Sequence, residues 1–135
     1  SLKAPALMVP VKGFVLSGDE IYGPSFTFDL SMIENPSSKY IRVEVKADME
    51  VGGQLTCMVS GERNGEQITN HDEVFWLGRD LEKMIETSQK GYFTFKIPEF
   101  IQEGDLLKIG TWSRNPASKV VIKSIHVEVY DNIWN

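Results

Sequence analysis

Carboxylates in turns are the residues of this sequence best suited to bond-breaking chemistry. Asp72, Glu73, Glu103 and Asp105 are the acids that could in principle meet across a cleft. Glycoside hydrolysis requires two carboxyl groups that face each other across a cleft at about 5 to 9 Å. The sequence supplies the acids but no spacing that brings a given pair together. A glycoside-active enzyme is therefore an alternative that ranks behind the two binding functions developed below.

Histidine and cysteine residues form no recognisable nucleophile or metal motif. His71 lies in a polar stretch and His126 in a hydrophobic run, and neither flanks a nucleophile motif such as Gly-x-Ser-x-Gly. Two isolated histidines without cysteine companions do not make a zinc-binding pattern. The single cysteine, Cys57, falls in an alternating run and is predicted to be a small buried hydrophobe. Catalysis is therefore not expected.

The composition of the 135 residues, 41% hydrophobic and 24% charged, is that of a globular protein. We expect a single domain spanning residues 1–135 with one core. The formal net charge of −5 provides no positive field for a phosphate backbone, so nucleic acid is not an expected partner. No apolar run approaches the roughly 18 residues that cross a bilayer, so this sequence is not expected to insert into a membrane.

Short hydrophobic runs of period two, separated by turn residues, predict an all-β fold, an antiparallel β-sandwich of about eight strands. In residues 40–49 the alternation is the most regular, so one face should be buried and the other wet. The pair Asn64-Gly65 predicts a tight hairpin. The expected strands are 11–16, 26–30, 40–49, 55–59, 66–77, 91–97, 106–112 and 120–130.

Two local features modify this strand pattern. Residues 80–87 carry helical periodicity, which predicts one short helical connector with Asp80 as its cap. In the last strand the hydrophobic set changes phase between Ile122 and Ile125. A β-bulge near Lys123-Ser124 would keep both parts of that set on the core side of the sheet.

The last third of the chain resembles the end of galactose-binding-like jelly rolls. The resemblance rests on a Gly-Asp turn and apolar strand at 104–112, a short turn at 113–116, and a Val/Ile-rich strand at 120–130. Many carbohydrate-binding modules and bacterial surface accessory domains have this fold. The chain departs from related domains at Lys123-Ser124, where they carry acids, and at Gly110, where they carry tyrosine. Roles tied to those acids do not transfer.

This resemblance implies a non-catalytic carbohydrate-binding or accessory module of a larger secreted or cell-surface protein, and therefore an extracytoplasmic location. A sugar would stack on an exposed aromatic ring and bond to neighbouring polar groups. Trp112 is the first candidate, because alternation places it on the outward face together with Lys108 and Gly110. The other candidate ligand-binding residues are Arg114, Asn115, Trp76 and Arg79. The alternative for Trp112 is a plug that closes the end of the sandwich.

Two further expectations concern a metal and a protein partner. Galactose-binding-like domains often hold a structural calcium, and Asp19, Glu20 and Asp131 stand at the corresponding places with oxygen ligands. No other cofactor is expected. A neighbouring protein domain is the alternative partner to carbohydrate, and a broad apolar patch at Met32 and Ile33 or at Ile133-Trp134 would favour this structural or interaction role.

Overall fold

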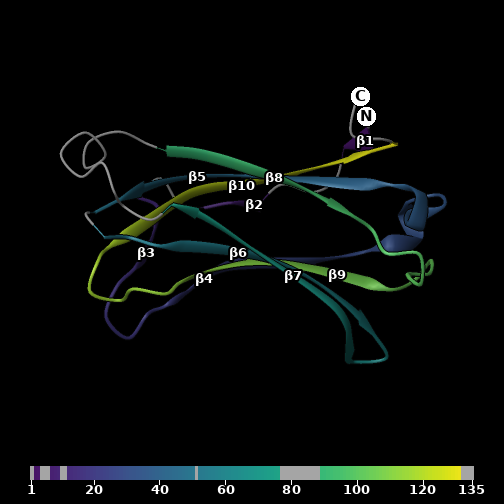
Figure 1. Cartoon of the computed structure of the whole chain (residues 1–135), viewed down its shortest axis with the longest axis horizontal. Coiled ribbons are helices and arrows are strands. Elements are labelled where there is room, and N and C mark those ends of the chain that lie inside the picture. The colour runs from purple at the N-terminus through teal and green to yellow at the C-terminus, as the bar shows by residue number, and fades with distance from the viewer. Residues whose placement is uncertain (1, 4–6, 10–11, 51, 77–88, 132–135) are drawn as a thin grey trace.

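Two antiparallel sheets pack face to face in a computed structural model that describes residues 2–3, 7–9, 12–50, 52–76 and 89–131 (Figure 1). The β10 sheet contains β1 (Leu2–Lys3), β2 (Leu7–Met8), β3 (Phe14–Leu16), β5 (Tyr40–Met49), β8 (Gln89–Lys96) and β10 (Val120–Tyr130). The β9 sheet contains β4 (Tyr22–Asp29), β6 (Leu55–Arg63), β7 (Glu66–Trp76) and β9 (Leu106–Ser113). The predicted all-β sandwich is therefore confirmed.

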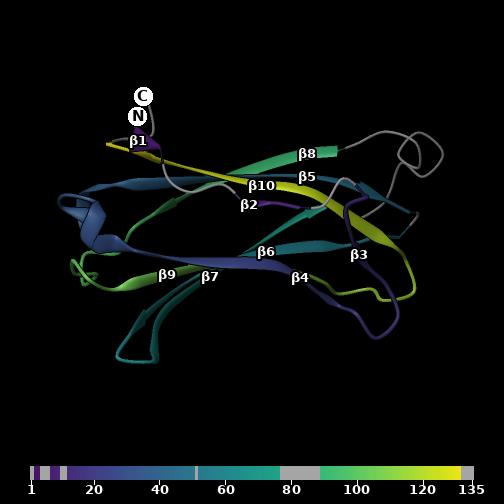
Figure 2. The same ribbon diagram turned by 180° about the vertical axis from the view of Figure 1, so that it is seen from behind.

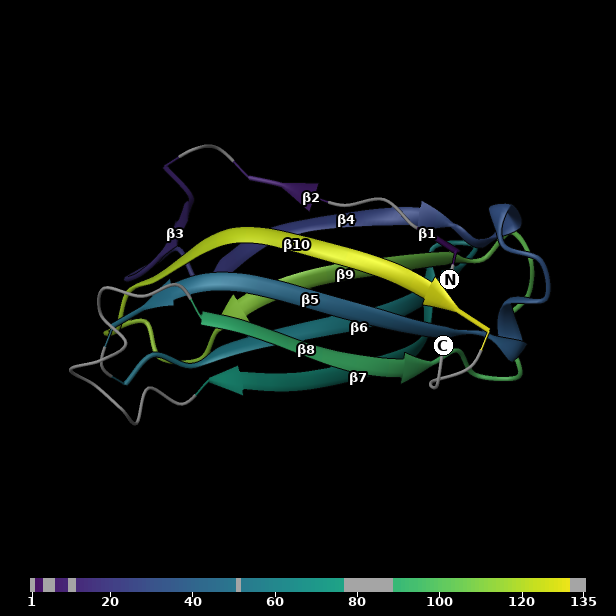
Figure 3. The same ribbon diagram turned by 90° about the horizontal axis from the view of Figure 1, so that it is seen from above.

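The strand order is that of a jelly roll. One sheet runs β1-β10-β5-β8, with β2 and β3 also paired to β10, and the other runs β4-β9-β6-β7. Seen from above, β10, β5 and β8 lie side by side over the other layer (Figure 3). From β3 onward, consecutive described strands lie in opposite sheets except β6 and β7, whose hairpin projects from the body of the sandwich (Figure 2). This interleaving is the double-sheet arrangement of jelly rolls.

The core forms where the inward faces of the two sheets meet. In β5, buried residues alternate with half-buried or exposed ones along the whole strand, as the sequence predicts. Cys57 is fully buried, which confirms its predicted packing role. The fully buried side chains of largest volume include Leu16, Leu30, Ile41, Leu55, Ile97, Leu107, Ile109, Ile122 and Ile125. Because these residues come from both sheets, the sandwich has one core.

The bulge predicted in the last strand is present. Ile122 pairs with Ala47 and Ser124 pairs with Lys46, so the residue between them is extra on the β10 side of the ladder. Ile122 and Ile125 are both fully buried as a result. One additional residue therefore restores the phase of the hydrophobic pattern.

Turn geometry explains where several strands begin and end. Asn64 and Gly65 adopt φ angles of 53° and 81°, which confirms the predicted hairpin. Of the strand expected over 11–16, the described residues from 12 onward show it beginning at Phe14, because Gly13 has a φ of 80° outside the strand region. The strand expected over 26–30 spans Tyr22–Asp29 instead, since Leu30 opens a 3₁₀ turn, η1 (Leu30–Met32). A second 3₁₀ turn, η2 (Pro36–Ser38), precedes β5.

The helical connector predicted at 80–87 lies outside the described residues. In the part of the chain that is described, no helix is long and apolar enough to span a membrane.

Candidate functional site

Trp112 lies on the outward face of the β9 sheet, where two neighbouring strands flank it. Its cross-strand partners are Tyr22 on β4 and Thr56 on β6. The rings of Tyr22 and Trp112 are stacked, with centroids 6.4 Å apart and planes inclined by 30°. Tyr22 is 64% exposed and Trp112 is half-buried, so the pair presents aromatic surface to solvent. The ring of Trp112 thus belongs to a sheet face and does not plug the sandwich.

Arg114 covers the same indole ring. Its guanidinium carbon lies 4.6 Å from the centroid of the Trp112 ring, which is a cation–π contact. The Nε–H of Arg114 donates to the hydroxyl of Thr56 at 3.1 Å, and this bond holds the arginine over the ring. The remaining guanidinium nitrogens are donors beside an aromatic surface. We call Tyr22, Trp112 and Arg114 the aromatic platform.

A hollow of about 320 Å³ adjoins the platform on the same face. Its lining residues are Tyr22, Gly23, Ser25, Met58, Lys108, Gly110 and Thr111. Gly110 keeps the floor low, because a Cβ atom at this position would lie 3.1 Å from the Cβ atom of Ser25. Lys108 and Gly110 thus share a face with Trp112, as strand alternation predicts.

Tyr22 is the platform residue that sequence analysis missed. The expected strand started at Phe26, because Gly23-Pro24 interrupts the hydrophobic alternation before it. In the structure β4 continues through that interruption, and its register with β9 shifts between Tyr22 and Ser25. The only sequence signal for Tyr22 was its position, an aromatic residue before Gly23-Pro24 and close to an expected strand. That pattern is weak evidence for a binding residue.

Asn115 belongs to the loop after β9 and not to the platform. Its side-chain nitrogen donates to the backbone oxygen of Gly52 at 2.9 Å, and its side-chain oxygen accepts from the Ala117 amide at 3.3 Å. Both ends of the amide are therefore engaged in holding two loops together. The Asn115 side chain thus contacts the loop at Gly52 rather than the aromatic platform.

The remaining aromatic candidate and its neighbour lie at the limit of the described chain. The backbone of Trp76 ends β7 opposite Leu55, while its side chain is outside the described part. Arg79 lies outside the described residues altogether. The structure therefore assigns no contact to either residue.

The loop acids considered for catalysis do not form a facing pair among the described side chains. Asp105 is buried and accepts two hydrogen bonds from Arg63, at 2.8 and 2.7 Å. The hydrogen bonds from Arg63 hold the pKa of Asp105 below its usual value. Glu103 is exposed, and the side chains of Asp72 and Glu73 are outside the described part. Asp105 is therefore a structural residue that anchors the turn before β9.

The two histidines contact neighbouring side chains of the sandwich. His71 lies in β7 opposite Val59, and its ring centroid is 5.4 Å from that of Phe93 and 5.3 Å from that of Phe95. It therefore packs between the sheets. His126 points outward from β10 and is described next.

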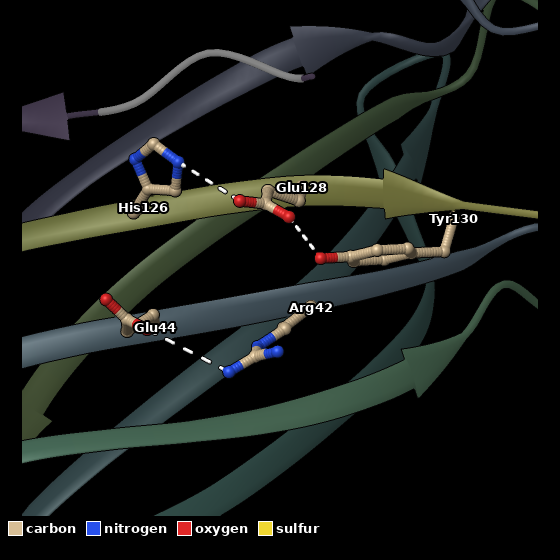
Figure 4. A pocket seen from close by; sticks show the side chains of 5 residues that line it. All are labelled: Arg42, Glu44, His126, Glu128 and Tyr130. Carbon is tan, nitrogen blue, oxygen red and sulfur yellow. Dashed lines mark hydrogen bonds and ion pairs between the residues drawn. The ribbon is translucent and has the colours of Figure 1, made fainter. Parts of the chain in front are cut away.

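A second hollow, of about 150 Å³, lies on the outer face of the β10 sheet (Figure 4). The carboxylate of Glu44 lies 4.0 Å from a guanidinium nitrogen of Arg42 and 3.6 Å from the ammonium nitrogen of Lys90. The carboxylate of Glu128 lies 3.6 Å from Nε2 of His126 and accepts a hydrogen bond from the Tyr130 hydroxyl. That hydrogen bond is the main cause of a raised pKa of Tyr130. Both carboxylates that line this hollow are thus engaged by neighbouring side chains.

The three acids expected to bind calcium lie at two ends of the molecule. Asp19 and Glu20 follow β3, whose residue Leu16 pairs with Val120 at the start of β10. Asp131 follows the other end of that strand and forms an ion pair with Lys39. Ten residue steps of strand separate these ends, or about 33 Å. Within the described residues, no group of three His, Cys, Asp or Glu side chains is arranged to hold a metal ion.

Comparison with known proteins identifies the fold. The sequence matches no family model, and it has no significant match among curated proteins. The structure matches "xylan-binding module CBM15" with a TM-score of 0.51 and 14% identity over 92% of this chain and 95% of that one. It matches "CBM4 structure and function" with a TM-score of 0.51 and 11% identity, covering 82% of this chain and 61% of that chain. The chain therefore has the same β-sandwich fold as these two solved structures.

The predicted resemblance to a jelly roll of this kind is thereby confirmed at the level of fold. At 11% and 14% identity, shared architecture does not carry over individual residues. The chain also spans only 61% of the length of the CBM4 structure, so the activity of a whole protein does not transfer. A functional argument must therefore start from the side chains on the two outer faces.

Proposed function

We propose that this domain is a non-catalytic carbohydrate-binding module that binds a glycan chain on the outer face of the β9 sheet. The observation that carries the proposal is the stacked pair Tyr22–Trp112 next to a hollow floored by Gly110. A pyranose ring has an apolar face that stacks on aromatic surface and hydroxyl groups that require polar partners at its edge. Arg114, Ser25 and Lys108 supply such partners on this face.

The β9 face is a better glycan site than the β10 face, although both expose a tyrosine. On the β10 sheet Tyr92 is 61% exposed, and Arg42 lies 4.1 Å from the centroid of its ring, a contact like that of Arg114 with Trp112. The adjoining hollow is about 150 Å³, compared with about 320 Å³ beside Tyr22. A longer saccharide therefore finds more room, and an aromatic stack, on the β9 sheet.

The role of a binding module also agrees with the state of the acids. Both carboxylate oxygens of Asp105 accept hydrogen bonds from Arg63, so Asp105 is not available as one of the two catalytic carboxyl groups of a glycosidase. Ile33, one of the residues on which a protein-docking patch would depend, is only 7% exposed. We therefore place glycan binding ahead of both alternatives, and we propose an extracytoplasmic location, where such modules meet polysaccharides.

Affinity electrophoresis through gels that contain plant, algal or host polysaccharides tests the proposal. We expect at least one glycan to retard the wild-type domain. Trp112→Ala and Tyr22→Ala should each weaken binding by about tenfold or more, since buried aromatic anchors commonly contribute that much. Tyr92→Ala is the matched control, because it removes an equally exposed tyrosine that lies beside an arginine on the opposite sheet.

The outcomes distinguish three hypotheses: a glycan site on the β9 sheet, a glycan site on the β10 sheet, and a domain that docks on a protein. Retardation that disappears in Trp112→Ala and persists in Tyr92→Ala, with circular dichroism unchanged, supports a glycan site on the β9 sheet. The reverse pattern moves the site to the β10 sheet and overturns the proposed location. No retardation by any polysaccharide overturns glycan binding and favours a domain that docks on a protein neighbour.

A further inference from the structure

Two cations on the β9 face have no carboxylate partner among the described residues. This is also true of Lys12, Lys46 and Lys96 elsewhere, but the β9 pair lies beside the aromatic platform and its hollow. Lys39, Arg63, Lys119 and Lys123 form ion pairs with Asp131, Asp105, Glu50 and Asp48, respectively. Within the described residues, Lys108 and Arg114 form no ion pair, although the chain has a formal net charge of −5. In an acidic protein, positive charges without partners on one face provide a local site for an anion.

The surroundings of Lys108 direct its charge toward the hollow. It is half-buried, and its cross-strand neighbours Thr27 and Ser60 are uncharged. The nearest acids on the two neighbouring strands are Asp29 and Glu62. Each is the cross-strand partner of Leu106, which lies two residues before Lys108. Asp29 also accepts a hydrogen bond from the Ser31 amide at 2.7 Å.

Neither of these acids pairs with Lys108, and the lysine lines the hollow beside Ser25 and Gly110. Its ammonium group is thus a hydrogen-bond donor with a full charge at the edge of the site. A negatively charged substituent placed in the hollow would provide the missing partner.

The distance between the two ends of the site suits a short oligosaccharide. Trp112 and Lys108 are four residues apart on β9, or about 13 Å along the strand. A saccharide chain that lies along β9 can therefore stack one ring on the Tyr22–Trp112 pair and place a later ring beside Lys108. Trp112 and Lys108 lie on one strand, so the distance between their backbone positions is fixed by that strand.

We propose that the β9 face selects an anionic glycan, in which a carboxylate or sulfate group pairs with Lys108 while a neighbouring ring stacks on Tyr22 and Trp112. This inference rests on the proposed function. The negative net charge of the domain opposes general attraction of polyanions, so selectivity must come from local pairing. Arg114 adds a second positive charge at the aromatic end.

Isothermal titration calorimetry with matched saccharides tests the charge requirement. The probes are oligogalacturonides, the same oligosaccharides as methyl esters, and sulfated galactan oligosaccharides. The esters keep the backbone and remove the charge. We expect Lys108→Gln to weaken binding of the preferred anionic probe by about tenfold, as for a lost charge-assisted hydrogen bond. Lys46→Gln is the matched control, since it removes one exposed lysine from the β10 sheet.

Each outcome has a defined meaning. Binding of one charged probe that falls in Lys108→Gln but not in Lys46→Gln supports the inference, and the two anionic probes distinguish carboxylate from sulfate. Equal binding of the acid and its methyl ester overturns the inference while leaving the proposed function intact. Equal losses in both lysine variants also overturn it, because they would reflect overall charge. No binding of any probe or polysaccharide, neutral ones included, overturns the proposed function as well.

Discussion

An arginine placed over an aromatic ring occurs on both outer faces, at Arg114 over Trp112 and at Arg42 over Tyr92, with distances of 4.6 and 4.1 Å. The difference between them lies in the neighbours. Arg114 bonds to the neutral Thr56, whereas Arg42 lies beside Glu44. A contact of the same type therefore leaves a charge available in one case and partly neutralises it in the other.

At the residue scale, the Arg63–Asp105 pair predicts an acid-sensitive anchor. Asp105 has a lower pKa in the folded protein than in the unfolded chain, so it stabilises the fold above its ordinary pKa. That contribution is lost as pH falls through the folded-state pKa. We expect Asp105→Asn to lower the melting temperature at neutral pH by several degrees and to flatten the decline of stability in acid. Thermal denaturation measured from neutral to acidic pH checks this.

Glu103→Gln is the matched control for that experiment. It removes an exposed acid two positions from Asp105, and we expect it to leave both the melting temperature and its pH dependence nearly unchanged. If Asp105→Asn keeps the full acid dependence of the wild type, the pair with Arg63 is not the source of that dependence.

At the scale of elements, the bulge in β10 determines which residues of the strand enter the core. Deletion of Lys123 would remove the extra residue between Ile122 and Ser124. Either Val120 and Ile122 or Ile125, Val127 and Val129 would then point away from the core. Because each of these side chains is at most 1% exposed, we expect the deletion to prevent stable folding.

Urea denaturation and near-ultraviolet circular dichroism measure the effect of that deletion. Lys123→Ala serves as its control, since it removes the side chain and its 3.6 Å ion pair with Asp48 but retains the residue. We expect it to cost about 0 to 1 kcal/mol. A deletion variant with the stability of Lys123→Ala would show that β10 tolerates either register.

The whole molecule is a sandwich whose two outer faces carry different chemistry and whose two ends lie about 33 Å apart. This length predicts the response to calcium. Asp19 and Glu20 lie beyond one end of β10 and Asp131 beyond the other, so the three cannot share one ion. We expect the melting temperature to be the same in calcium and in a chelator such as EDTA. A higher melting temperature with calcium would contradict this and would require ligands elsewhere in the chain.

Much of this architecture was readable from the sequence, because period-two hydrophobicity and turn residues are local properties. The alternation in β5, the Asn64-Gly65 hairpin and the β10 bulge were each predicted from neighbouring residues alone. The outward position of Trp112 followed from the same alternation. These features depend on which face of a strand a residue occupies, and that is determined within the strand.

Only the tertiary structure decided which residues meet across strands. Tyr22 joined the platform because the register of β4 against β9 shifts at Gly23-Pro24 and places it opposite Trp112. Asn115 lies apart from the platform, because its side-chain amide donates a hydrogen bond to the backbone oxygen of Gly52, 63 positions away in the chain. Asp19 and Asp131 were separated by the length of β10. Pairing, register and long-range hydrogen bonds depend on residues far apart in sequence, so no local pattern contains them.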